Sequence, residues 1–258
     1  MMWNAPEIAV TLSDTTQVGT VARMDVVAAR EQPVATAYLE LSNVRFEWND
    51  GAKDGDALGI QWGWRGEELL PLFTGSVLRA HLRETLQIWG LCKARILADT
   101  RVSRTYQNEA ADAILRHLVG ECGIDTQDIV PCPTLLDKLP LHDNSVLEAL
   151  SFLDRRLELG RAIYCDAEGG FRWEEENTDQ EAAFTFTHGE DVSEWKALPG
   201  GRFLLTTIAT PVWHSQVVAV VDEEGECARY YVEQVRHTLG ILGEGARSQF
   251  WLRSLSDG

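Results

Sequence analysis

Two helix-like segments, each ending at a glycine, interrupt a chain that otherwise alternates in the manner of β-strands. In the first, apolar residues recur at helical spacing and form a single stripe. Asn108 is the expected N-cap, and Gly123 is expected to end this helix in a left-handed conformation. The stripe consists of Ala111, Ile114, Leu115, Leu118, Val119 and Cys122.

The second segment begins at Ser145, which has the spacing of a capping box with Glu148. Gly160 is expected to end this helix with a positive φ. The period then falls to two in Ala162–Cys165, and a turn-rich stretch precedes Phe171–Trp173. The pattern predicts a helix followed by a β-hairpin. The buried face of the helix would consist of Val146, Leu150, Leu153 and Leu157.

Strand-like alternation occupies both flanks of this middle region, with turn signals at Asn49–Gly51 and Lys53–Gly55. The spacing predicts an antiparallel sheet that is closed or nearly closed on itself. The expected strands are Ile8–Leu12, Val18–Ala28, Ala35–Leu41, Val44–Trp48, Leu58–Trp64, Leu69–Arg83, Thr85–Leu91, Phe203–Thr210, Gln216–Val221, Ala228–Thr238 and Gln249–Leu255. We therefore predict an α+β, mostly β chain with β domains at 1–100 and 201–258 and an α/β middle region at 101–200.

The order of these elements resembles one protein family, the tail hub proteins of the phage late control gene D family. Such hubs are related to the baseplate hubs of contractile phages and to the N-terminal part of type VI secretion spike proteins. The middle region resembles theirs in its Tyr-Gln-Asn start at Tyr106, its Asn-Ser at Asn144 and its two glycine-ended helices. Two flanking stretches agree in order: Leu72–Val77, which contains Phe-Thr-Gly, and Tyr231–Gly240, which is followed by Gly245–Ser248.

The resemblance implies a structural subunit with two tail-tube-like antiparallel β-barrels. Three copies would form a homotrimeric, pseudo-six-fold ring that encloses a DNA channel at the tail tip. The implied partners are the tail tube or a distal tail protein ring, a central spike or tip protein and the tape measure protein. DNA would only pass through, without specific binding. The implied location is the virion tail, assembled in the bacterial host cytoplasm.

Composition bounds the remaining possibilities. No apolar run approaches the roughly 20 residues of a membrane helix, and the N-terminus lacks the basic and apolar regions of a signal peptide. We therefore expect no membrane insertion by this chain. The cysteines lack ligand spacing with one another or with histidine, so we expect neither zinc nor another metal or cofactor. We expect reduced, buried thiols at Cys92, Cys122, Cys132, Cys165 and Cys227.

The net charge of −17 argues against a general nucleic-acid binder. Charge is also unevenly distributed. The segment Asp166–Lys196 is strongly acidic, and it is either a solvated loop or linker, or a surface that repels DNA or docks a basic partner. A basic stretch contains Arg79, Arg83, Lys93, Arg95, Arg101 and Arg104.

Catalytic patterns are missing from the sequence: it has no Gly-x-Ser-x-Gly, no phosphate-binding glycine loop and no His-Glu-x-x-His. We expect no catalytic residues and no enzyme activity. His188 lies near carboxylates and is expected to be solvated. The run Glu174–Glu176 is expected at the surface, although a glycosidase carboxylate is conceivable. Trp62 and Trp64 would share a strand face, as core or as a sugar-binding surface. The alternative function is a soluble carbohydrate-binding or cell-wall hydrolase module of the tail.

Overall fold

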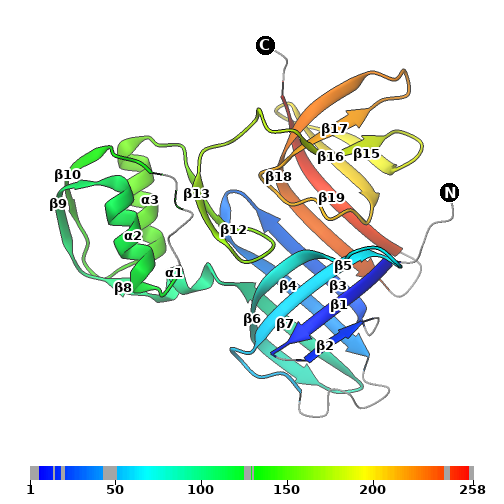
Figure 1. Cartoon of the computed structure of the whole chain (residues 1–258), viewed down its shortest axis with the longest axis horizontal. Helices are drawn as coiled ribbons and strands as arrows, with labels where there is room; N and C mark the ends of the chain where they lie inside the picture. Colours follow the sequence, from blue (N-terminus) through cyan, green and yellow to red (C-terminus); the bar gives the residue numbers. More distant parts are fainter. Residues whose placement is uncertain are drawn as a thin grey trace.

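The computed structural model describes residues 6–13, 15–18, 21–42, 51–124, 129, 131–240 and 245–255. It is mostly β, with three helices among the described residues, and it has a β-sheet body from which a helical lobe projects (Figure 1). None of its described helices has the length and apolar character that crossing a membrane requires. The predicted α+β, mostly β class is confirmed.

The N-terminal strands form one continuous antiparallel run in the order β3-β4-β7-β6-β5-β1-β2. Alternate residues point into the core, as in β7, where Leu86, Ile88 and Cys92 are buried. The strands are β1 (Pro6–Leu12), β2 (Thr15–Val18), β3 (Val21–Ala29), β4 (Gln32–Ser42), β5 (Ala57–Trp64), β6 (Leu70–Leu82) and β7 (Thr85–Cys92). The predicted strand Val44–Trp48 lies outside the described residues.

The C-terminal strands pair in the order β15-β16-β19-β18, and β14 and β17 extend from β18. They are β14 (Ala182–Thr187), β15 (Val192–Leu198), β16 (Arg202–Ile208), β17 (Val217–Val221), β18 (Cys227–Gly240) and β19 (Gly245–Ser254). All pairs are antiparallel except β14 with β17, which is parallel.

Strand β18 joins the two sets of strands into one 13-stranded sheet. Its first half, up to Tyr231, pairs with β17, and its second half, from Gln234, pairs with β3. An irregularity between Val232 and Gln234 separates the two halves. Such a bulge increases the local twist, so one strand can belong to two differently oriented parts of a sheet.

The helical lobe (95–157) comprises α1 (Arg95–Asp99), β8 (Arg101–Val102), β9 (Thr105–Ala110), α2 (Ala111–Glu121), β10 (Leu135–Pro140), β11 (Asn144–Ser145) and α3 (Val146–Leu157). Helix α3 packs against α1 and α2. The predicted stripe of α2 is buried as expected. The predicted capping box is also confirmed, because Glu148 N donates to Ser145 Oγ at 3.2 Å and Ser145 N donates to the Glu148 carboxylate at 2.8 Å. The lobe is followed by the predicted hairpin of β12 (Ala162–Cys165) and β13 (Phe171–Glu174).

Two helix boundaries differ from the prediction. Asn108 is not the N-cap of α2, because it lies within β9 with a φ of 52° and the helix begins only at Ala111. Pairing of β9 with β10 keeps this residue in the sheet. Helix α3 ends at Leu157, before the expected glycine, and Glu158 adopts the left-handed C-cap conformation. Gly160 still has a positive φ, of +64°, and Gly123 has one of +67°.

The reading of Asp166–Lys196 as a loop or linker is wrong. This segment contains β13, β14 and most of β15, which pair with β12, β17 and β16. Most of its charged residues are exposed, such as Glu194 in β15. Period-two alternation is weak in β15 because its register shifts between Val192 and Glu194.

Replacing Gly160 with valine should lower the free energy of unfolding by about 1–2 kcal/mol, because a β-branched residue adopts a left-handed conformation only at a cost. A Cβ added at Gly160 would meet no atom within 4 Å, so the effect is mainly that of the backbone conformation. Glu158→Gly is the matched control and should raise the free energy of unfolding, because glycine adopts the left-handed C-cap conformation without the cost that glutamate has there. Urea unfolding measures both, and a Gly160→Val protein as stable as the parent would contradict the assignment.

Candidate functional site

The β12–β13 hairpin lies where the two sets of strands and the lobe meet (Figure 1). Its turn contacts β6, because Thr74 Oγ1 donates to Ala167 O at 2.9 Å. From the C-terminal side, Trp213 Nε1 donates to Cys165 O at 3.4 Å. The Phe-Thr-Gly stretch noted in the sequence therefore has a structural role. Its glycine, Gly75, must lack a side chain because a Cβ would lie 2.2 Å from Leu91 O.

Arg30, at the turn between β3 and β4, is the residue that links the hairpin to the sheet. Its side chain is only 6% exposed. The guanidinium donates to Glu174 O at 2.7 Å and to Ser215 Oγ at 3.1 Å. The Glu176 carboxylate lies 4.0 Å from Arg30 Nε. This one cation therefore links the β3–β4 turn, the end of β13 and the segment before β17. These contacts compensate the cost of burying its charge.

Aromatic rings and a neutral histidine surround this cation. The rings of Tyr164 and Tyr231 have their centroids 5.8 and 5.9 Å from the guanidinium carbon, within cation–π range. Burial, with a smaller contribution from Arg30, lowers the pKa of His214 to about 3. His214 is therefore neutral at neutral pH, and it shares a hydrogen bond with Ser215 Oγ at 2.9 Å.

The run Glu174–Glu176 takes part in this junction. Glu174 is half-buried and accepts a hydrogen bond from the Tyr164 hydroxyl, which differs from the expected surface position. Glu175 and Glu176 are exposed as predicted, and they pair with Arg161 at 3.3 Å and with Arg253. Their carboxylates are committed to ion pairs and structural hydrogen bonds, which favours a structural role over a glycosidase role.

A second buried histidine lies in the core where β5 faces β18. His237 is hydrogen-bonded to Ser248 Oγ at 2.9 Å and to Val212 O at 3.1 Å. The Trp62 ring meets its edge at 5.4 Å. Burial lowers the pKa of His237 to about 3. Trp62 is thus a core residue, whereas Trp64 is only partly buried on the same strand.

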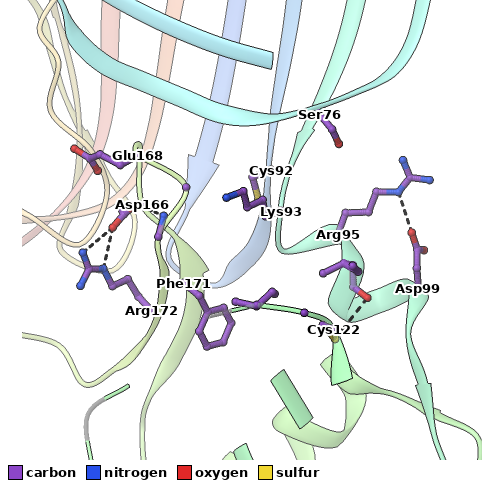
Figure 2. A pocket seen from close by; sticks show the side chains of 15 residues that line it. Ser76, Cys92, Lys93, Arg95, Asp99, Cys122, Asp166, Glu168, Phe171 and Arg172 are labelled. Carbon is purple, nitrogen blue, oxygen red and sulfur yellow. Dashed lines mark hydrogen bonds and ion pairs between the residues drawn. The ribbon is translucent and has the colours of Figure 1, made fainter. Parts of the chain in front are cut away.

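Figure 2 shows a cavity of about 910 Å³ between the sheet, the hairpin turn and the lobe. Four of its charged side chains form two ion pairs, one on each side of the cavity (Figure 2). Arg95 pairs with Asp99 at 3.0 Å, and Arg172 pairs with Asp166 at 2.8 Å. The cavity thus separates the lobe from the sheet. Its lining has equal numbers of basic and acidic side chains.

Two thiols meet beside this cavity. Cys92, at the end of β7, and Cys165, at the end of β12, are both buried, and the Cys92 thiol donates to Pro33 O at 3.6 Å. The interaction between the two thiols lowers the pKa of Cys92 to about 7, and the same interaction together with burial raises the pKa of Cys165. Cys122 and Cys132 are also buried. The expectation of a buried thiol is wrong for Cys227, which is exposed at the start of β18.

The basic stretch does not form one patch. Arg79 stacks over Trp89 at 4.4 Å, and Arg83 lies at the hairpin between β6 and β7. Arg95 follows the other end of β7. That end lies about 26 Å from the Arg83 end, because β7 has eight residues and a strand rises about 3.3 Å per residue. Arg101 pairs with Glu148 at 3.6 Å in the lobe. These residues therefore serve different local contacts.

His188 lies at the turn after β14, partly buried, with its ring 5.9 Å from that of Trp195. The structure brings it together with an aromatic cluster in which Trp195 stacks on Phe203 at 4.9 Å. The expectation that it is simply solvated is therefore wrong. In the junction, the Ser215 hydroxyl is hydrogen-bonded to His214 but also accepts from Arg30, so it serves the structural link between the hairpin and the sheet.

The chain is similar to solved structures over nearly its whole length. The 43 kDa tail protein of prophage MuSo2 from Shewanella oneidensis matches with a TM-score of 0.73 and 14% identity, covering 96% of this chain and 98% of that chain. A tail protein from Neisseria meningitidis matches with a TM-score of 0.74 and 12% identity, covering 97% of each. No protein-family model matches the sequence, and no curated protein matches it.

A third structure extends the comparison to secretion systems. It is the E. coli c3393 protein, described as a type VI secretion component with structural similarity to the bacteriophage T4 tail proteins gp27 and gp5. It matches with a TM-score of 0.69 and 11% identity, covering 96% of this chain and 77% of that chain. This chain has the fold of phage tail proteins. The resemblance to tail hubs stated from the sequence is confirmed at the level of the fold.

Sequence reasoning missed Arg30, the residue that the junction depends on. Nothing in its local pattern marks it, since an arginine between two strands usually faces water. Its partners Glu174 and Ser215 are 144 and 185 residues away along the chain. The role of Arg30 becomes visible only when the hairpin has been placed on the sheet.

Replacing Arg30 with methionine should lower the free energy of unfolding by about 3 kcal/mol, because Glu176, Ser215 and the Glu174 carbonyl lose their shared donor. Arg23→Met is the matched control: Arg23 is exposed on the neighbouring strand and should change stability by less than about 0.5 kcal/mol. Chemical denaturation followed by tryptophan fluorescence measures both. Equal losses in the two variants would contradict a special role for Arg30.

The two buried histidines should make stability depend on pH. Their folded pKa values, about 3, lie below the unfolded value of about 6.5, so their contribution is complete above pH 6.5 and is lost as the pH falls toward 3. His237→Gln should flatten the slope of unfolding free energy between pH 6 and 4, by up to about 1.4 kcal/mol per pH unit. Exposed His142→Gln is the control, and an unchanged slope in the His237 variant would contradict the assignment.

Proposed function

We propose that this chain is the structural hub subunit of a phage or phage-like tail tip. The observation that carries the proposal is the match to phage tail proteins through both sets of strands and the intervening lobe, over 96% of the chain. In this proposal the two β regions are tail-tube-like barrels. The first ends near residue 100, and the second begins at β14 rather than at residue 201, because β14 and β15 pair with β17 and β16. The lobe then projects from the barrels as a surface for partners.

Three copies would form a ring in which six similar barrels match a six-fold tube above to a three-fold spike or tip below. Open strand edges support association, because unpaired edges in a monomer are costly and attract other chains. Within the described residues the sheet has free edges at β2, β14 and β15. A contact between unlike surfaces of successive copies closes into a ring when its rotation is 120°.

The proposed ring would enclose the channel through which DNA passes, with the tail tube or a distal tail ring, a spike protein and the tape measure protein as neighbours. A polyanion slides most freely past a wall that is acidic or neutral, and a net charge of −17 is compatible with such a wall. Arg79, Arg83 and Arg95 would then lie away from the channel. In this proposal the chain has a purely structural role in the virion tail, which is assembled in the host cytoplasm.

Light scattering on the purified protein at high concentration, alone and mixed with its tube and spike proteins, tests ring formation. The expected mass of the hub component is about 86 kDa, three times the 28.8 kDa chain. A matched mixture without the hub is the control. A stable monomer under every one of these conditions would contradict the proposal, and clearing of peptidoglycan in a zymogram would favour the hydrolase alternative.

A further inference from the structure

Strand β14 has an unprotected edge. Native sheets guard their edges with charges, prolines or very short strands. The edge strand β15 carries Glu194 and Lys196, and β2 is only four residues long. By contrast, β14 reads Ala-Ala-Phe-Thr-Phe-Thr, with neither a charge nor a proline. It pairs on one side with β17, and no described strand pairs with its other side.

A pocket of about 330 Å³ lies beside this edge. Phe184 of β14 forms one wall, and Trp64 and Leu70 of the N-terminal strands form another. Phe184 and Leu70 are 38% and 43% exposed, which is high for large apolar side chains. The ring of Phe184 rests 4.7 Å from that of buried Phe186, so it is held in place. The pocket is therefore a preformed apolar recess at the end of a free strand edge.

The rim of this recess is acidic. Glu67 and Glu68 line the pocket and are exposed. Asp179 and Glu181, also exposed, come directly before β14. Among the described lining residues there is no lysine or arginine. A second copy of β14 would bring the same acids and meet like charge, so charge complementarity favours a basic partner over self-pairing.

We propose that the β14 edge and the adjacent pocket bind an extended basic segment of another protein, which adds a strand to β14 and inserts an apolar side chain between Phe184 and Leu70. In such strand addition, main-chain hydrogen bonds supply affinity and pockets for alternate side chains supply specificity. Lysine or arginine at the intervening positions would face the rim formed by Glu67 and Glu68. The inference does not depend on ring formation.

The probe is a fluorescent peptide of about eight residues in which valine and lysine alternate. Fluorescence anisotropy with the full-length protein should show saturable binding. Phe184→Lys should weaken it at least tenfold, about 1.4 kcal/mol, because the charge repels the peptide and blocks the pocket. Leu135→Lys, which changes an exposed leucine of the lobe, is the matched control and should bind like the parent. Hydrogen exchange should show new protection in 182–187 when the peptide is bound.

Three results would overturn the proposal. The first is equal binding of a valine–glutamate peptide, which would exclude the acidic rim as the determinant. The second is that Phe184→Lys and Leu135→Lys weaken peptide binding equally, or that the bound peptide protects residues outside β14 from hydrogen exchange. The third is that the protein without peptide has twice the mass of one chain and that Phe184→Lys abolishes this dimer. That result would mean that a second copy occupies the edge. Ala183→Lys, at an exposed position that does not pack in the core, repeats the test if Phe184→Lys unfolds the protein.

Discussion

The arrangement of this protein depends on a buried cation. Arg30 is almost completely removed from water, and its cost of desolvation is offset only because two separate segments, the end of β13 and the segment before β17, supply it with acceptors. Each of these segments loses a partner if another one moves. A single side chain therefore couples the β3–β4 turn, the central hairpin and the segment before β17. The rings of Tyr164 and Tyr231 and neutral His214 complete this junction.

Around that junction, β18 makes the body one structure. It pairs with β17 in its first half and with β3 in its second, so the N-terminal and C-terminal strands share a sheet. The lobe, by contrast, connects through the short helix α1 and the residues after α3, with a cavity between lobe and hairpin (Figure 2). This contrast suits a tail subunit that needs a rigid body for assembly and a projecting part for other contacts.

Local patterns in the sequence predicted most of the elements, and nonlocal contacts account for what they missed. The capping box at Ser145 and the apolar stripe of α2 act within a few residues, so they were readable. Asn108 failed as a cap because β9 pairs with β10 across a long connection. Strands β14 and β15 were not predicted, because the acidic residues around them are typical of a solvated loop and a register shift interrupts the alternation of β15. The Arg30 junction joins residues far apart in the chain, which no periodicity reveals.

The most direct test of the central claim, that this chain is the hub of a tail tip, is a cryo-electron microscopy reconstruction of the assembled particle. The account predicts three copies in a ring between the tail tube and the spike, with the lobe on the outside of the ring and the channel lined by acidic or neutral side chains. A particle that lacks the chain, or that contains it in another number or away from the tip, would contradict the account. A pore lined by Arg79, Arg83 and Arg95 would contradict its electrostatic part.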